Sequence, residues 1–241
     1  ESALGGGAQT GALFGLIFLV FAFVAAPFII GDYNLYLINL IAINSIVAIG
    51  LNILVGYTGQ ISLGHAGFFA IGAYACVLSM LKLGLPFIIA LPAAGFFAAI
   101  FGFLLGLPSL RLEGPYLSIA TLGFGMAVTQ IISHSEFTGG HMGLEAPKMS
   151  IGPFVAHSSS QQYAIIITTT FIMTIAAVNL MKTRVGRAFR AIRDSEIAAE
   201  AMGINVLKYK TLSFAVSAFY AGISGGLTAF TLEHVGAGSF N

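Results

Sequence analysis

Seven long stretches without a charged residue constrain this chain more than any other feature. A helix that crosses the hydrocarbon core of a membrane needs roughly 20 mostly apolar residues, and each stretch is about that length. Strands of a membrane barrel would be shorter and would alternate polar and apolar residues, which these stretches do not. The sequence therefore predicts an all-α, polytopic transmembrane helical bundle with spans at 10–30, 34–55, 61–81, 85–110, 115–133, 163–181 and 211–232.

The composition agrees with lipid as the main solvent of the chain. Only 8% of its 241 residues are charged, whereas 57% are hydrophobic. A typical soluble domain carries about 25% charged residues, which cover its surface with solvated groups. We therefore expect most of the surface of this bundle to contact membrane lipid.

Basic residues concentrate in one connection between predicted spans. Residues 182–210 hold seven of the ten lysines and arginines. Because connections rich in lysine and arginine stay on the cytoplasmic side, we expect this segment in the cytoplasm. Counting back through the spans places the connection 134–162 outside. Its glycines and prolines suit an ordered lid or docking loop, although a simple connection explains them equally well.

A polar interruption separates the second and third predicted spans. The stretch 56–64 begins Gly-Tyr-Thr-Gly-Gln, which in a soluble protein would predict a turn. At membrane depth it predicts a broken or re-entrant helix, which is tolerated where protein or water satisfies the backbone. Such helix ends can line substrate sites in transporters. We expect a translocation pathway beside Asn52, Gln60, Ser62 and His65, with Tyr116 and Thr121 opposite. The alternative is that these groups only form hydrogen bonds to neighbouring helices.

The basic connection carries helix signals of its own. Asp194 is placed as an N-cap and Gly203 as the residue after a helix end, which predicts a short helix over 195–202. Arginines at 187, 190 and 193 repeat every three residues on the preceding stretch. A projecting short helix suits docking to a cytoplasmic partner. Simple anchoring at lipid head groups explains the charge, but it does not explain the capped helix.

Glycine pairs predict close helix packing inside the bundle. Gly102 and Gly106 form one G-x-x-x-G pair, and Gly222 and Gly226 form another. Small residues let helix backbones approach closely where lipid provides no hydrophobic driving force. These pairs indicate a tight bundle and no particular function.

Four segments together resemble one known family. They are GLNILVGYTGQISLGHAGFFAIGAYA (50–75), EGPYLSIATLGFG (113–125), TGGHMGLEAP (138–147) and GRAFRAIRDSEIAAEAMGINVLKYKTLSFAVSAFYAGISGGL (186–227). In this order they are similar to the LivM-type permeases of branched-chain amino acid ABC importers. The resemblance implies one transmembrane permease domain over 1–241, in the bacterial inner membrane. Because family members continue through further helices, it also implies that the chain is truncated at its C-terminus.

The resemblance also implies partners and a coupling role. Family members pair with a second, LivH-like permease subunit, with cytoplasmic ATPase subunits and with a periplasmic substrate-binding protein. The ATPase-contacting loop of the family falls on 186–204. The resemblance assigns ATPase coupling to Arg190, Arg193, Asp194, Glu196, Glu200 and Gly203. Nucleic acid is not an expected partner.

Several function classes have no support in the sequence. The chain lacks the G-x-x-x-x-G-K-S/T loop that holds nucleotide phosphates, so ATP hydrolysis is expected from other subunits. It also lacks the H-E-x-x-H zinc motif, and we predict neither catalysis nor a metal or cofactor. Relatives that transport urea, short amides, sugars or nucleosides are the first alternative. A channel or facilitator uncoupled from ATP is the second.

Overall fold

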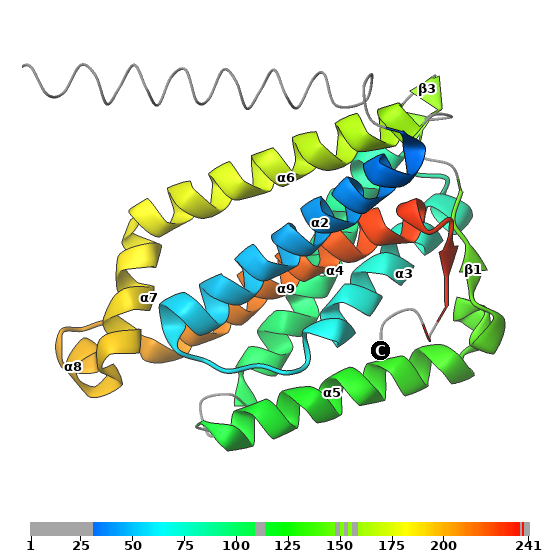
Figure 1. Ribbon diagram of the computed structural model, residues 1–241. Helices are drawn as coiled ribbons and strands as arrows, with labels where there is room; N and C mark the ends of the chain where they lie inside the picture. Colours follow the sequence, from blue (N-terminus) through cyan, green and yellow to red (C-terminus); the bar gives the residue numbers. More distant parts are fainter. Residues whose placement is uncertain are drawn as a thin grey trace, which may run out of the picture.

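Six long helices dominate the part of the chain that the structure describes. The computed structural model describes residues 31–108, 114–147, 150–151, 154–155, 159–236 and 238. Within these residues six helices are long and apolar enough to cross a membrane, which confirms the polytopic bundle (Figure 1). They are α2 (Asp32–Leu51), α3 (His65–Leu83), α4 (Phe87–Gly106), α5 (Pro115–His134), α6 (Ser159–Lys182) and α9 (Val206–Thr231). The first predicted span, 10–30, lies outside the described residues.

Glycine and proline fix several helix ends. Gly84 follows α3 in the left-handed conformation, with φ of 63°, which a residue with a side chain rarely adopts. Pro86 is extended and directly precedes α4. Pro115 is the first residue of α5, where its missing N–H costs no helical hydrogen bond. These residues produce the short turn between α3 and α4 and the sharp start of α5.

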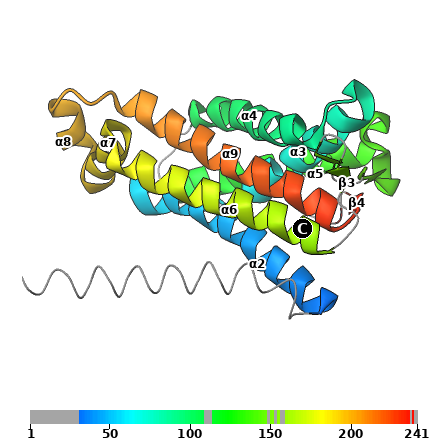
Figure 2. The same cartoon turned by 90° about the horizontal axis from the view of Figure 1, so that it is seen from above.

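The centre of the bundle is α9. In its most apolar window 78% of the residues are buried, against 17% for α6, although both are apolar enough to span a membrane. Helices α2, α3 and α4 all pack against α9. Figure 2 shows α9 running between α4 on one side and α2 and α6 on the other. The apolar core therefore surrounds α9, whereas α6 exposes most of its surface.

Glycines allow this close packing, as the G-x-x-x-G pairs predict. A Cβ atom added to Gly72 of α3 would lie 2.3 Å from the Cα atom of Gly222 of α9. One added to Gly102 of α4 would lie 2.4 Å from the Cβ atom of Ala218. Both distances are far too short for real carbon atoms. The backbones of Gly72 and Gly222 therefore meet directly, and at Gly102 only the methyl group of Ala218 lies between the two helices. The packing role predicted for Gly102 and Gly222 is confirmed.

The segment between α6 and α9 folds into two short helices at one end of the bundle. They are α7 (Arg184–Asp194) and α8 (Glu196–Ala201), and together they are called the elbow. The prediction that Asp194 caps the second helix is wrong. Asp194 is the last residue of α7, and the extended Ser195 accepts a hydrogen bond from the backbone N–H of Ala198. Gly203 follows with φ of 80°, as predicted for a residue after a helix end.

Short elements order the loop at the opposite end. Helical turns η3 (Glu136–Thr138) and η4 (Gly140–Met142) lead into β1 (Leu144–Glu145), which pairs antiparallel with β4 (His234–Val235). A second pair joins β2 (Ser150–Ile151) to β3 (Phe154–Val155). The Tyr74 hydroxyl of α3 donates a 3.2 Å hydrogen bond to the carbonyl of Val235. The order expected for part of 134–162 is therefore present, and its docking role stays a prediction.

Candidate functional site

The helical conformation is interrupted between α2 and α3, as the glycine-flanked stretch predicts. Helix α2 continues into a π-helical turn, η1 (Asn52–Gly56), and the helical conformation ends at Thr58. Gly59 has φ of 72°, and α3 begins only at His65. In Figure 1 the connection turns back from the elbow end before α3 starts. Residues 57–64, the last two helical residues and the non-helical stretch 59–64 that follows them, are together called the unwound segment.

Gln60 attaches the unwound segment to the first turns of α9. Its side-chain nitrogen donates to the Ser213 hydroxyl at 2.8 Å and to the Lys210 carbonyl at 3.5 Å. It also lies 3.2 Å from the Thr58 hydroxyl, which donates to the Leu54 carbonyl at 2.6 Å. Gln60 is 5% exposed, so these contacts replace water. Side-chain hydrogen bonds therefore compensate for the lost helical ones.

His65 forms a second attachment through both of its ring nitrogens. Ser217 of α9 donates to the Gly50 carbonyl at 2.7 Å, so its oxygen accepts from His65 Nε2 at 2.6 Å. Nδ1 then accepts from the Ser62 hydroxyl at 3.2 Å. This chain of donors assigns the ring proton to Nε2. Both nitrogens are satisfied within the protein, and the ring packs edge-on against Phe68.

The opposite side of the unwound segment contacts α5. Leu63 donates its backbone N–H to the Thr121 hydroxyl at 3.0 Å, and Ser118 donates to the Ile61 carbonyl at 3.4 Å. Gly64 allows this contact, because a Cβ atom there would lie 2.0 Å from the Thr121 carbonyl oxygen. The unwound segment is thus held between α9 and α5. The polar side chains that hold it are called the polar seam: Thr58, Gln60, Ser62, His65, Ser118, Thr121, Ser213 and Ser217.

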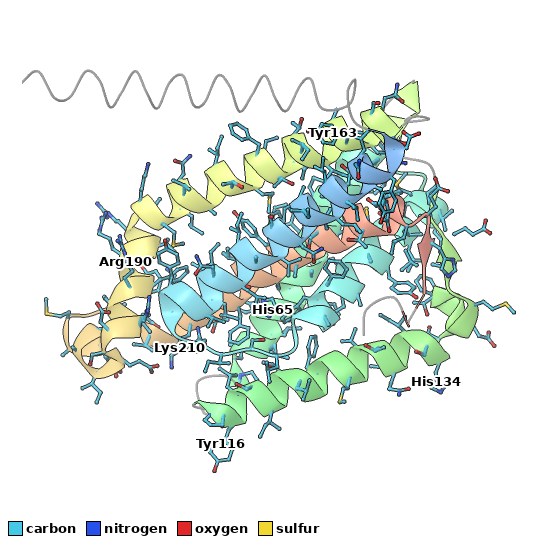
Figure 3. The ribbon with its side chains drawn as sticks, in the orientation of Figure 1. His65, Tyr116, His134, Tyr163, Arg190 and Lys210 are labelled. Carbon is cyan, nitrogen blue, oxygen red and sulfur yellow. The ribbon has the colours of Figure 1, made fainter. Side chains whose placement is uncertain are left out.

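The structure brings together four of the six predicted pathway residues. Gln60, Ser62, His65 and Thr121 belong to the polar seam and are buried. Asn52 is exposed, with its side-chain oxygen against Gly56. Tyr116 is 72% exposed and points away from the bundle (Figure 3). In the described state the seam residues bond to neighbouring helices, as the simpler alternative expected, and the pathway role stays a prediction.

Sequence reasoning missed the α9 partners of the seam. Lys210, Ser213 and Ser217 recur at intervals of three and four residues, which places them on one face of a helix. That spacing was the available signal for a polar stripe in an otherwise apolar span. It indicates the face, but it does not indicate which residues of the distant segment 57–64 lie against it.

The elbow contacts the end of η1 and the first turns of α9, next to the polar seam. The Arg193 guanidinium donates a short hydrogen bond to the Gly56 carbonyl, at the end of η1. Glu196 of α8 forms an ion pair with Lys210 of α9. Arg190 instead contacts carbonyls of Gly186 and Met181, and its side chain projects away from the bundle (Figure 3). Two of the predicted coupling residues, Arg193 and Glu196, therefore adjoin the polar seam.

The chemistry available at this site is hydrogen bonding and charge pairing. Among the described residues no group of three or more histidines, cysteines or acidic residues is placed to hold a metal ion. The structure thus offers hydrogen bonds and one ion pair that could rearrange between the elbow, the unwound segment and α9.

Comparisons with known proteins place the chain in a family. The profile described as branched-chain amino acid transport system, permease component, matches residues 33–240. The chain is 34% identical, over 99% of its length, to the high-affinity branched-chain amino acid transport permease LivM of Escherichia coli, and 33% identical to that of Salmonella typhimurium. It spans 62% of the length of each.

A second type of relative matches more weakly, and solved structures add nothing. The permease protein LivH of Salmonella typhimurium is 25% identical over 76% of this chain and 65% of its own length. Among solved structures none matches. The profile match covers most of the chain and agrees with the two LivM relatives. The chain therefore belongs to the family of permease components of branched-chain amino acid transport systems.

Proposed function

We propose that the chain is a transmembrane permease subunit of an ATP-driven importer for branched-chain amino acids. Family membership supports this function, and the LivM relatives carry that substrate in their names. ATP hydrolysis would come from separate cytoplasmic ATPase subunits. The membrane would be a bacterial inner membrane, with the elbow in the cytoplasm and the β1–β4 end outside.

The shape of the elbow is the observation that carries the coupling proposal. Two large apolar side chains are almost fully exposed here: Ile197 of α8 at 84% and Met202, which directly follows α8, at 82%. Both lie close to Glu200 in the sequence. An exposed apolar pair beside charges is typical of a protein-binding surface, because such residues fill pockets on a partner. Anchoring at lipid head groups would need only the arginines.

The residues proposed for coupling divide into two groups by position. Arg190 and Glu200 are exposed and free to meet an ATPase, with Gly203 shaping the turn after α8. Arg193 and Glu196 face the bundle and would pass displacement inward. Asp194 lies at the joint between α7 and α8 and would set its angle.

The translocation pathway is proposed along the unwound segment. Gln60, Ser62, His65 and Thr121 would line it once the hydrogen bonds of the polar seam rearrange, with Asn52 at one end. Tyr116 lies on the exposed face of α5. It would line the pathway where a second permease subunit packs against that face. A LivH-like subunit is proposed for that place, because LivH proteins are also among the relatives of this chain. A substrate-binding protein would dock at the β1–β4 end.

Purification from native membranes in mild detergent tests the proposal. We expect stoichiometric recovery of a cytoplasmic ATPase with the wild-type chain. Reversing or inserting charge on the exposed elbow surface, as Arg190→Glu with Ile197→Asp, should abolish this recovery. Lys82→Glu is the control, because it reverses an exposed charge at the end of α3, away from the elbow, and, among the contacts that the structure gives, removes only that with the Phe137 ring.

Transport assays then separate the proposal from its rival. Reconstituted wild-type transporter should accumulate leucine only when ATP is supplied on the elbow side. Leucine uptake that proceeds equally without ATP, together with recovery of the chain without an ATPase, would establish an uncoupled facilitator instead.

A further inference from the structure

Arg193 links the elbow to the end of the helix that precedes the unwound segment. Its guanidinium donates to the carbonyl of Gly56, the last residue of η1. Carbonyls at a helix C-terminus lack helical partners and carry partial negative charge, so a cation is well placed there. The Arg193 side chain also lies against Gly59, where an added Cβ atom would be 3.7 Å from Cγ. Arg193 of α7 therefore lies against both Gly56 and Gly59, the stretch in which the helical conformation ends.

Lys210 makes a second link between the elbow and the seam. Its side chain is 6% exposed and pairs with Glu196 of α8, which is 43% exposed. Its backbone carbonyl accepts from Gln60 at 3.5 Å and from the Ser213 hydroxyl at 2.7 Å. A buried ammonium is costly unless it is paired. The position of α8 is therefore tied to the turn of α9 that holds Gln60.

We propose that Arg193 and Lys210 form a latch through which the elbow sets the position of the unwound segment. The latch consists of the Arg193–Gly56 hydrogen bond and the Glu196–Lys210 ion pair. Displacement of α8 by a partner breaks or shifts both contacts at once. Gly56 and Gln60 then move, and the polar seam opens. This inference rests on the proposed function and names the positioning residues of its coupling step.

The unwound segment is the part of this region that yields most easily. Gly59 and Gln60 still donate their backbone N–H groups to the carbonyls of Val55 and Leu54, but 61–64 are outside any helix, so moving them does not require a helix to unfold. The segment depends on side-chain contacts to α9 and α5, and each such neutral hydrogen bond adds only modestly to stability. The two contacts from the elbow each have an ionised partner, and that of Lys210 is strengthened by burial, because ionised partners form stronger hydrogen bonds where water is excluded.

Arg190 and Lys208 are basic residues of the same region, but the contacts that the structure gives for their side chains do not join the elbow to the polar seam. Arg190 contacts carbonyls of its own neighbourhood, Gly186 and Met181. Lys208 is exposed, although it lies only two residues from Lys210. Figure 3 shows Lys210 at the elbow end of the bundle, where its side chain is buried. Lys208 is therefore a matched control for the loss of a positive charge.

The test uses the complete transporter in proteoliposomes, with radiolabelled leucine as the probe. Leucine uptake and ATP hydrolysis are measured together for wild type, Lys210→Met, Arg193→Gln and Lys208→Met. We expect the ratio of leucine transported to ATP hydrolysed to fall about tenfold in the two latch variants, within the usual range for coupling between sites. The ATPase should still be recovered in full with each variant. Lys208→Met should keep the wild-type ratio.

Glu196→Gln keeps the inference testable if a latch variant fails to fold. Its side chain is partly solvated, and the Gln amide oxygen can still accept a hydrogen bond from the Lys210 ammonium, so Lys210 keeps a partner while the charge pairing is lost. The double variant Glu196→Gln, Lys210→Met should be no worse than Lys210→Met alone, because both remove one interaction.

The outcomes separate the latch from the proposed function. A wild-type ratio in Lys210→Met, Arg193→Gln and Glu196→Gln, in a transporter whose wild type needs ATP, overturns the latch alone. Lost uptake with proportionally lost hydrolysis also overturns it, because a merely supporting role lowers both together. A wild type that transports leucine without ATP overturns the proposed function, and the latch with it.

Discussion

The two halves of α9 use opposite means to hold their neighbours. Beyond residue 218 the helix packs against glycines of α3 and α4, and its Ser224 and Thr228 hydroxyls bond within the helix, to the carbonyls of Ala221 and Ser224. Tyr220 makes the one contact between helices that the structure gives for a hydroxyl of this half, to the Met173 carbonyl of α6. Before that residue, Ser213 and Ser217 bond side chains and carbonyls of other elements. Close glycine contacts occur along both halves, but hydrogen bonds between serine side chains and other elements are confined to the half before residue 218.

This difference separates a fixed region from an adjustable one. Backbones in van der Waals contact through glycine have one arrangement, because packed interfaces do not deform continuously. Hydroxyl, amide and imidazole groups can exchange partners, since each has several donors or acceptors. We infer that the half near the β1–β4 end serves as a frame. The half near the elbow serves as the joint on which the unwound segment moves.

The largest effect is expected from a side chain placed in the fixed half. Gly72→Leu puts its Cβ atom 2.3 Å from the backbone of Gly222, where no rotamer change can relieve the clash. We expect a loss of about 3 kcal/mol or more, at or above the upper range for overpacking. Thermal unfolding of the purified protein in detergent should show it as a large drop in Tm.

The control for this substitution is Gly123→Ala on α5. A Cβ atom at Gly123 meets nothing within 4 Å, so stability should be unchanged or slightly higher. Equal losses of Tm for the two variants would contradict the inference that glycine contacts fix this half of α9. The loss would then follow from replacing any glycine within a helix.

An intermediate effect is expected in the adjustable half. Gln60→Leu removes hydrogen bonds to α9 at similar volume and should destabilise the protein by about 1 kcal/mol. Combining it with Ser213→Ala should give less than the sum of the single losses, because both remove one contact. Denaturant titration of the four proteins measures this coupling.

Ser224→Ala supplies the comparison for that cycle. The Ser224 hydroxyl bonds only to the carbonyl of Ala221 among the contacts that the structure gives, so the effect of its loss should add to that of Gln60→Leu. Non-additive losses with Ser224 as well would show that the two halves of α9 respond as one unit, and the division between frame and joint would be wrong.

The lengths of the apolar runs and the positions of the glycines between them predict the helices of this fold well, because both act on local backbone conformation. The runs that became α2 to α6 and α9 each have to bury their backbone polar groups in their own hydrogen bonds, so sequence length alone indicates a helix. The interruption after Gly56 was visible for the same reason. Gly102 and Gly222 indicated close packing without indicating that their helices meet each other.

The candidate site was predicted only in part because its contacts are between distant residues. Gln60 and His65 are polar in an apolar region, which the sequence shows directly. Their partners Ser213 and Ser217 lie about 150 residues away in the chain, and which side chains meet depends on how α9 is rotated. The N-cap was misplaced by one residue, because Asp194 and Ser195 are both good caps and α7 extends one residue further than its pattern indicates.

The smallest effect is expected at that misplaced cap, and it tests whether the joint depends on α8. Ser195→Ala leaves the Ala198 N–H without its side-chain acceptor, at a cost of about 1 kcal/mol. Because α8 has six residues and little helical stability of its own, the cost should appear as faster opening of that helix. Hydrogen exchange of a peptide covering 195–202 should accelerate about fivefold, which corresponds to 1 kcal/mol. Asp194→Ala should not accelerate it, because Asp194 ends the preceding helix.

If exchange of 57–64 accelerates together with that of α8 in Ser195→Ala, the adjustable half of α9 takes its stability from the elbow. If α8 loosens while 57–64 stays protected, the polar seam holds the joint by itself.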